Sequence, residues 1–307
     1  MVDPVVWDIG YLISASLFIM GIKKLSSPRT APEGNSLGAM GMLLAVLVTL
    51  AKLQTEGVIG WELIIGGLAI GSLIGYMMAT RVEMTGMPEL VALFNGFGGG
   101  ASALVGLSEA LKRIQESNIP DPGVELYAIW VAIGLSGIVG WITLTGSLVA
   151  MYKLKGGFTV PFTGKWVRFP TWGPSWLNAV KTLLLLSSFA LIWMTIQEPS
   201  EHSWIYALAL SSGLLGILFV LPIGGADMPV VVSLLNSLSG IAAAFTGFVI
   251  GNNVLIIAGS MVGAAGLILT FIMCKAMNRE LFDVLFKAFG GSGEKDQLTR
   301  TKVGSDP

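Results

Sequence analysis

The chain alternates between long apolar runs and short polar segments along most of its length. A helix needs about 20 predominantly apolar residues to cross the hydrocarbon core of a bilayer, and nine runs come close to that length. Their approximate ranges are 7–22, 36–51, 61–79, 88–111, 126–152, 176–196, 204–221, 229–250 and 254–274. The pattern therefore predicts an all-α, polytopic membrane helix bundle with nine transmembrane helices.

Composition supports lipid as the solvent of these helices. Of the 307 residues, 53% are hydrophobic and 12% are charged, whereas soluble domains carry about 25% charged residues. The single cysteine, Cys274, cannot form an intrachain disulfide or by itself a metal site, and the single histidine, His202, falls in a short polar segment between two runs. We expect no metal in this chain and no nucleic-acid partner.

Basic residues are distributed unequally between alternate loops. One side of the predicted bundle has 14 lysines and arginines and the other has three, while Lys181 lies inside a span. The larger set is Lys23, Lys24, Arg29, Arg81, Lys153, Lys155, Lys165, Arg168, Lys275, Arg279, Lys287, Lys295, Arg300 and Lys302. Because cytoplasmic loops carry the excess of lysine and arginine, we expect the N-terminus outside and the C-terminus in the cytoplasm.

One segment of the chain occurs twice. A shift of 141 residues aligns 87–106 with 228–247, and nine of the 20 positions are identical, including the Met-Pro pairs and the asparagines Asn95 and Asn236. Both copies belong to spans that are predicted to start at the cytoplasm, so the repeat is parallel.

Each repeated asparagine follows a proline by seven residues. Proline suits the first turn of a helix, which places the amide about 10 Å into the helix. An amide at this depth in a membrane needs a hydrogen-bond partner. It either lines an ion or substrate path or makes a helix-to-helix hydrogen bond worth about 0.6 kcal/mol, and the sequence leaves both readings open.

Several other residues have two readings. Asp227 either caps the second repeat helix or faces the cytosol beside the span of Asn236. Glu89 lies in the first turn of its helix, where capping is the favoured role. Gly259 and Gly263 have the spacing that lets helices approach closely, although ordinary membrane packing explains most of the glycines. A helix over 280–289 either lies at the cytoplasmic headgroups or continues the ninth span.

Three strings in order resemble the β subunit of proton-translocating NAD(P) transhydrogenase. They are residues 81–93 (RVEMTGMPELVAL), 224–236 (GGADMPVVVSLLN) and 272–279 (IMCKAMNR). The resemblance covers about residues 7–279. It implies an enzyme subunit that is not catalytic alone, in an assembly that transfers hydride between NADH and NADP and couples this transfer to inward proton movement.

The resemblance also implies the partners of this chain. NAD and NADP would be cofactors of the assembled enzyme, with none bound in this chain. The partners would be transhydrogenase α-type subunits and an NADP-binding domain, with a homodimer of the assembled unit in the cell inner membrane. Residues 1–279 would form the transmembrane proton-channel domain, and 280–307 a cytoplasmic linker toward an NADP-binding domain absent from this chain.

Two features depart from the family pattern. In some relatives a histidine thought to carry the proton stands at the position of Asn95, and asparagine does not titrate. We therefore expect a partner membrane subunit to contribute the titrating group. The chain stops at Pro307, and no Gly-x-Gly-x-x-Gly fingerprint follows a strand in it, so we expect no nucleotide binding by the chain alone.

These observations lead to two sets of candidate site residues. The hypothesis for the proton pathway names Asn95, Asn236, Asp227 and Glu89. The hypothesis for coupling names Gly259, Gly263, Gly266, Lys275 and Arg279, because the ninth span ends where the NADP-binding domain would join and its two cations lie four apart on one helix face. The alternative function is a secondary transporter built on the parallel repeat.

Overall fold

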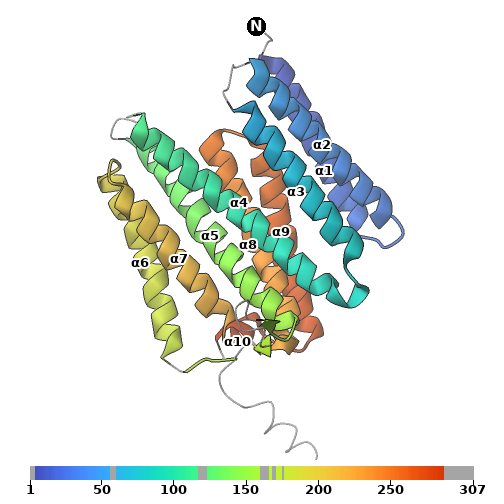
Figure 1. Cartoon of the computed structure of the whole chain (residues 1–307), viewed down its shortest axis with the longest axis vertical. Coiled ribbons are helices and arrows are strands. Elements are labelled where there is room, and N and C mark those ends of the chain that lie inside the picture. The colour runs from blue at the N-terminus through green and yellow to red at the C-terminus, as the bar shows by residue number, and fades with distance from the viewer. Residues whose placement is uncertain are drawn as a thin grey trace, which may run out of the picture.

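The computed structural model describes residues 4–55, 60–116, 123–159, 166–167, 171–174 and 176–286. Within these ranges nine helices are long and apolar enough to cross a membrane, which confirms the predicted type and number of spans. They are α1 (Pro4–Leu25), α2 (Ala31–Thr55), α3 (Trp61–Arg81), α4 (Met87–Gln115), α5 (Val124–Leu154), α6 (Leu177–Gln197), α7 (His202–Val220), α8 (Met228–Ile250) and α9 (Asn253–Ala276), shown in Figure 1.

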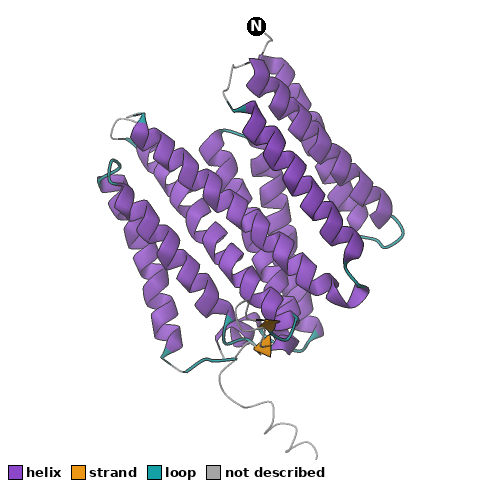
Figure 2. Ribbon diagram, viewed as in Figure 1, coloured by secondary structure: helices purple, strands orange, loops and turns teal. Residues whose placement is uncertain are grey.

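The remaining elements are short and lie at the helix ends (Figure 2). Two 3-10 turns, η1 (Met84–Gly86) and η2 (Gly225–Asp227), lead into α4 and α8. A two-residue strand pair, β1 (Phe158–Thr159) and β2 (Trp166–Val167), lies in the connection between α5 and α6 and was not predicted from the sequence. A helix of six residues, α10 (Leu281–Phe286), follows α9.

The sequence repeat appears as a repeated pair of elements. The same 141-residue offset relates η1 and α4 to η2 and α8, and each long helix begins at a methionine followed by a proline in the first turn. A first-turn proline loses no helical hydrogen bond, because that N–H would have no partner in the helix. The local signals that define the two helix starts are therefore the same in both copies.

A tight turn joins α8 to α9. Gly251 has a φ of 65°, in the left-handed region that glycine adopts without steric cost. The side-chain oxygen of Asn252 then accepts a hydrogen bond of 3.1 Å from the backbone N–H of Leu255, which caps α9. The two helices consequently run antiparallel and side by side along their length.

The bundle is organised around α5. Helices α4, α7 and α8 pack along it, and α9 packs along α8. The α6–α7 hairpin lies at one edge and the α1–α2 hairpin at the opposite edge, where α1 contacts α9 (Figure 1). One apolar cluster surrounds Trp130, and a second surrounds Met228 and includes Val284 of α10. We call the end of the bundle that holds this second cluster the α10 end.

Helix α3 is the least packed of the long helices. None of the residues in its apolar window is buried, and Leu63 is 83% exposed. A Cβ added at Gly67, Gly71 or Gly75 would meet nothing within 4 Å. These glycines have the spacing of a helix interface, yet in the described part of the chain nothing packs against them.

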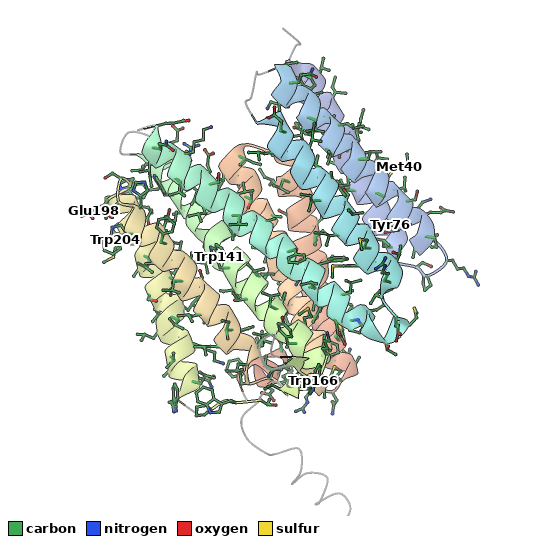
Figure 3. The ribbon with its side chains drawn as sticks, viewed as in Figure 1. Met40, Tyr76, Trp141, Trp166, Glu198 and Trp204 are labelled. Carbon is green, nitrogen blue, oxygen red and sulfur yellow. The ribbon has the colours of Figure 1, made fainter. Side chains whose placement is uncertain are left out.

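The outer surface of the bundle suits lipid. Large apolar side chains such as Met40 on α2 and Tyr76 on α3 are exposed there (Figure 3). At the turn between α6 and α7, the indole N–H of Trp204 donates to the carboxylate of Glu198 at 3.4 Å. A tryptophan at the end of an apolar helix, with its N–H on a polar partner, is typical of a membrane boundary.

Candidate functional site

Asn95 belongs to α4, and its side chain is buried between α4 and α5. It is 9% exposed, and its Nδ2 donates to Oγ of Ser147 on α5 at 3.2 Å. Its Oδ1 is buried and has no hydrogen-bond partner among the described residues. Exchanging the two ends of the amide does not remove the problem, because one end would still lack a partner.

Glycines let α4 and α5 approach closely enough for this contact. A Cβ added at Gly96 would lie 3.0 Å from Cβ of Ser147, and one added at Gly99 would lie 2.6 Å from Cβ of Thr143. Larger residues at these positions would separate the helices and break the bond between Asn95 and Ser147. The glycines beside Asn95 therefore belong to the site, although the sequence offered no way to distinguish them from packing glycines.

Asn236 occupies the equivalent place on α8 and is half-buried. Higher in the bundle, Oγ1 of Thr246 donates to the backbone oxygen of Ser102 at 3.3 Å, which fixes the relative height of α8 and α4. Asn95 precedes Ser102 by seven residues and Asn236 precedes Thr246 by ten. At about 1.5 Å per residue, the two asparagines lie within about one helical turn of the same depth.

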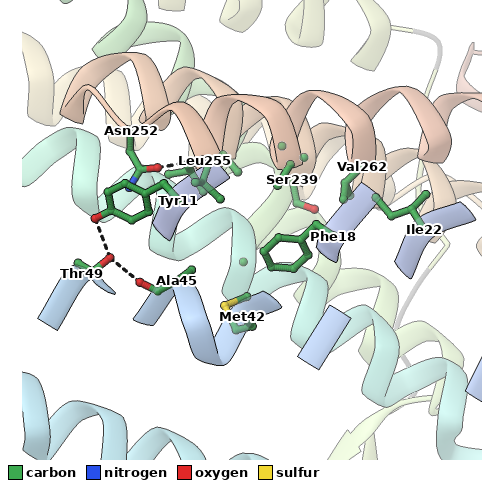
Figure 4. A pocket seen from close by; sticks show the side chains of 16 residues that line it. Tyr11, Phe18, Ile22, Met42, Ala45, Thr49, Ser239, Asn252, Leu255 and Val262 are labelled. Carbon is green, nitrogen blue, oxygen red and sulfur yellow. Dashed lines mark hydrogen bonds between the residues drawn. The ribbon is translucent and has the colours of Figure 1, made fainter. Parts of the chain in front are cut away.

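A cavity of about 350 Å³ lies on the far side of these asparagines from the α10 end, between the α1–α2 hairpin and helices α4, α8 and α9 (Figure 4). Gly98 and Ser239 both line it. They are equivalent positions of the repeat, each three residues after its asparagine and hence on the same face of its helix. The opposite wall includes Tyr11, whose hydroxyl is hydrogen-bonded to Thr49 at 3.1 Å.

The two asparagines thus share a depth, and about one helical turn beyond each of them Gly98 and Ser239 border one cavity. Neither asparagine lines that cavity, and the side chain of Asn95 bonds to α5 instead. A direct contact between Asn95 and Asn236 is not among the hydrogen bonds of the described residues. From their equivalent places in the two repeats we predict that Asn95 and Asn236 face each other or a shared wet cavity, and the contacts described here do not test this prediction.

Asp227 and Arg279 form an ion pair at the α10 end. Nε of Arg279 lies 3.8 Å from Oδ1 of Asp227, so the pair joins the start of α8 to the segment after α9. Asp227 holds the N-cap position of α8, but its side chain makes no capping hydrogen bond. The sequence named both residues without predicting that they pair. Lys275 lies on the last turn of α9 and is exposed. Arg279 follows the turn at Asn278, past the end of α9, so the prediction that the two cations share one helix face is wrong.

Glu89 lies away from this pair, in the first turn of α4. Its carboxylate makes no capping hydrogen bond in the described part of the chain, although an acidic group there remains favourable for the helix dipole. It lines a separate cavity of about 320 Å³ with Arg81, Val82 and Gly86. The structure therefore does not place Glu89 together with Asn95 and Asn236.

The candidate coupling glycines lie at the interface between α9 and α8. A Cβ added at Gly259 would lie 2.6 Å from the backbone N of Ala244, and one added at Gly266 would lie 2.9 Å from Cα of Ser237. A Cβ added at Gly263 would meet Cγ1 of Ile241 at 3.0 Å. All three glycines are thus needed for the close approach of the two helices.

Buried hydroxyl groups reinforce the same interface, and sequence reasoning did not find them. Oγ of Ser237 donates to the backbone oxygen of Gly263 at 2.6 Å, and Oγ of Ser233 donates to that of Gly266 at 3.3 Å. Oγ1 of Thr270 bonds to Oγ of Ser233 at 3.1 Å. The two serines lie four apart on one face of α8, which was the available signal.

Helix α10 does not continue the ninth span. The chain turns at Asn278, which has a φ of 52°, before α10 begins. Val284 is 2% exposed and packs into the cluster around Met228, so one side of α10 faces protein, while Phe282 is 61% exposed. Lys181, which is 4% exposed, donates to the backbone oxygen of Leu285 at 3.4 Å. Residues 287–289 of the predicted helix lie outside the described residues.

No group of three or more histidine, cysteine, aspartate and glutamate side chains that could hold a metal ion occurs within the described ranges. His202 is the first residue of α7 and is exposed. Asn95, Asn236 and the buried serines and threonines carry amides and hydroxyls, which can orient water and exchange hydrogen bonds but carry no charge, whereas the buried Lys181 bonds to α10. Such a set can conduct or position a proton only beside a group that titrates.

Known proteins can be aligned with most of this chain. The profile of the NAD(P) transhydrogenase beta subunit family matches residues 7–305. Two relatives, each named NAD(P) transhydrogenase subunit beta, come from Rhodospirillum rubrum and from a defined strain of that species, and each is 41% identical over 283 residues. The alignment covers 92% of this chain and 58% of each relative, so the chain spans little more than half of their length. From these matches, the chain belongs to the NAD(P) transhydrogenase beta subunit family.

Proposed function

We propose that this chain is the membrane part of a proton-translocating transhydrogenase, in which hydride transfer between NADH and NADP is coupled to proton movement across the membrane. The nucleotides would bind to parts of the assembly other than this chain. The observation that carries the proposal is the buried amide of Asn95, on a repeat helix of a member of this family.

The unpaired oxygen of Asn95 is costly in isolation. A buried polar atom without a partner costs about 1–3 kcal/mol, so the site favours any donor that can reach it. Water is one such donor, and a protonated side chain of a neighbouring subunit is another. The amide would then hold a donor in place at the depth where α4 and α8 carry their equivalent asparagines.

The group that carries the proton would come from a partner. Asn95 does not titrate, and His202 lies at an exposed helix end. The cavity between the α1–α2 hairpin and helices α4, α8 and α9 begins about one helical turn beyond Asn95 and Asn236, at Gly98 and Ser239. A helix of an α-type subunit beside this cavity could bring a titratable side chain to the asparagines.

Asp227 and Arg279 would form the cytoplasmic end of the path. They lie at the α10 end, where the basic residues of the described helix ends gather, and that end would face the cytoplasm. The cell inner membrane would hold the assembly. The NADP-binding domain would join beyond α10, and two assembled units would form the homodimer.

The test of this function uses the assembled complex, with its α-type subunit and NADP-binding domain, in sealed vesicles. Asn95→Leu removes the amide but keeps the number and branching of the side-chain heavy atoms. We expect the rate of hydride transfer driven by an imposed proton gradient to fall about ten-fold or more, because removal of one polar group in a proton path costs about 1.4 kcal/mol or more. Binding of NADP should be unchanged.

The matched control is Asn253→Leu, at an exposed asparagine in the first turn of α9. Its gradient-driven rate should equal that of the unmodified assembly. Full gradient-driven activity in Asn95→Leu would refute the assignment of Asn95 to the proton path. An unmodified assembly that transferred hydride without moving protons would refute the function as a whole.

A further inference from the structure

Lys153 makes an unusual set of contacts at the α10 end. It lies in the last turn of α5, and its Nζ donates to three backbone oxygens at the end of α7 and in the turn that follows. The acceptors are Val220 at 3.3 Å, Leu221, and Ile223 at 2.7 Å. An ammonium has three N–H donors, so these carbonyls use all of them.

The contact with Ile223 goes beyond capping of α7. A lysine that only satisfied the last carbonyls of a helix would need Val220 and Leu221. Ile223 lies past the helix end, in the turn toward α8, and its side chain is fully buried in the cluster around Met228. Ile223 is therefore held twice, through its backbone oxygen by Lys153 and through its side chain by the apolar cluster.

Asp227 lies four residues after the anchored Ile223. The segment from Ile223 passes through Gly224 into η2, where the N–H of Asp227 donates to the backbone oxygen of Gly224 at 3.2 Å. The carboxylate of Asp227 then faces Arg279. Only a short, glycine-containing segment separates the anchored Ile223 from Asp227, so the position of the carboxylate depends on the anchor.

The first repeat provides an internal comparison. Its equivalent turn runs from Val82 through η1 to Gly86, and Gly86 stands where the second copy has Asp227. Among the described residues, the hydrogen bonds of that turn are backbone bonds, such as the one from the N–H of Gly86 to the oxygen of Glu83 at 2.9 Å. The three hydrogen bonds of Lys153, which we call the lysine clamp, thus occur in the copy of the turn that has a carboxylate, Asp227, at the position directly before the long helix, where the first copy has Gly86.

We propose that Lys153 is a positioning residue: it fixes the α7–α8 turn and thereby places Asp227 opposite Arg279 at the cytoplasmic entrance of the proton path. This inference rests on the proposed function for its consequence, although the clamp itself can be tested without activity. Without Lys153, the α7–α8 turn would lose all three of these hydrogen bonds. Asp227 could then move away from Arg279.

The test uses the assembled enzyme with Lys153→Met, which keeps the long apolar stem and removes the donors. Lys155→Met is the control, since Lys155 lies two residues further on and is exposed. We expect Lys153→Met to reduce the ratio of gradient-driven to gradient-free hydride transfer about ten-fold, because displacing a reacting group by about 1 Å costs up to about 100-fold. NADP affinity should stay the same.

A distance measurement reports on the clamp directly. Spin labels at Ala226→Cys and Lys275→Cys, in a Cys274→Ala background, should give a narrow distance distribution that broadens in Lys153→Met and stays narrow in Lys155→Met. Asp227→Asn should lower the same activity ratio, and adding Lys153→Met to it should lower the ratio no further.

Three results would overturn the proposal. The first is a spin-label distance distribution that stays narrow in Lys153→Met, and the second is a broadened distribution with an unchanged ratio of gradient-driven to gradient-free hydride transfer. The third is a ratio in the double variant, Lys153→Met with Asp227→Asn, that falls by the sum of the two single losses. If Lys153→Met does not assemble, Lys153→Gln, which is shorter and cannot reach three carbonyls, provides the same comparison. If the unmodified assembly moves no protons, the proposed function fails, while the spin labels still decide whether Lys153 holds the turn.

Discussion

The contact between α8 and α9 allows a graded prediction about stability. In Gly259→Ala the new Cβ would start 2.6 Å from the backbone N of Ala244 and 2.7 Å from the backbone O of Gly240. Ordinary van der Waals contact begins at 3.4 Å, and backbone atoms cannot rotate out of the way. The substitution must therefore move one helix away from the other.

Two opposing terms set the size of the effect. Overpacking of this kind costs about 1–3 kcal/mol, while replacing glycine by alanine inside a helix gains about 1 kcal/mol. Separation of the helices also stretches the bond from Ser237 to Gly263, which is worth about 1 kcal/mol. We expect Gly259→Ala to destabilise the chain by about 1–3 kcal/mol.

Two further variants complete the series. At Gly263 the nearest atom to an added Cβ is Cγ1 of Ile241, the movable part of a side chain, at 3.0 Å. Gly263→Ala should therefore cost less than Gly259→Ala. Gly71→Ala, on α3, meets nothing within 4 Å and should be neutral or stabilising by up to about 1 kcal/mol.

The assay is the free energy of unfolding of the purified chain in mixed micelles, titrated with a denaturing detergent and followed by circular dichroism. The expected order of stability is Gly71→Ala first, Gly263→Ala second and Gly259→Ala last. Equal stability of Gly259→Ala and Gly71→Ala would refute the reasoning, since it would mean that α8 and α9 do not touch as closely as described.

Two more predictions concern transport. In the assembled enzyme, Gly263→Leu should force α9 away from α8 and uncouple hydride transfer from proton movement with nucleotide binding intact; unchanged coupling, or the same loss in Gly71→Leu, would argue against a role for this interface. The chain reconstituted alone should show no proton conductance with a midpoint near pH 6–7, about the range of histidine, because Asn95 does not titrate and His202 is exposed at a helix end. A conductance with that midpoint would show that the chain contains its own titrating group.

The spans and the repeat could be predicted because their signals are local. An apolar run long enough to cross a membrane forms a helix regardless of which elements pack beside it, because its backbone groups must bond to each other. The Met-Pro pairs mark the start of the long helix in both copies of the repeat. The two-residue strand pair carries no such signal. The hydroxyl contacts of Ser233 and Ser237 could have been found from their spacing, but serines in membrane helices also bond within their own helix.

The contacts at the α10 end could not be predicted, because they depend on tertiary packing. Asp227 and Arg279 are far apart in sequence, and their pairing requires the turn at Asn278 as well as the α8–α9 hairpin. Lys181 sits where a lysine would be expected to extend toward water, yet it is buried and bonds to α10. In the sequence, Lys153 is one of 14 basic residues on the predicted cytoplasmic side, and nothing distinguishes it from the others.

The short length of α10 has a consequence for local opening. A helix of six residues is not stable in water alone, since helices shorter than about 12 residues are marginal. Its backbone hydrogen bonds persist only while α10 stays docked, with Val284 packed in the cluster around Met228 and Lys181 donating to the backbone oxygen of Leu285. The amides of 281–286 should therefore exchange with solvent through a local unfolding step of their own, well below the free energy that protects α5. Hydrogen exchange in this segment would measure the equilibrium for local unfolding at the α10 end of the bundle.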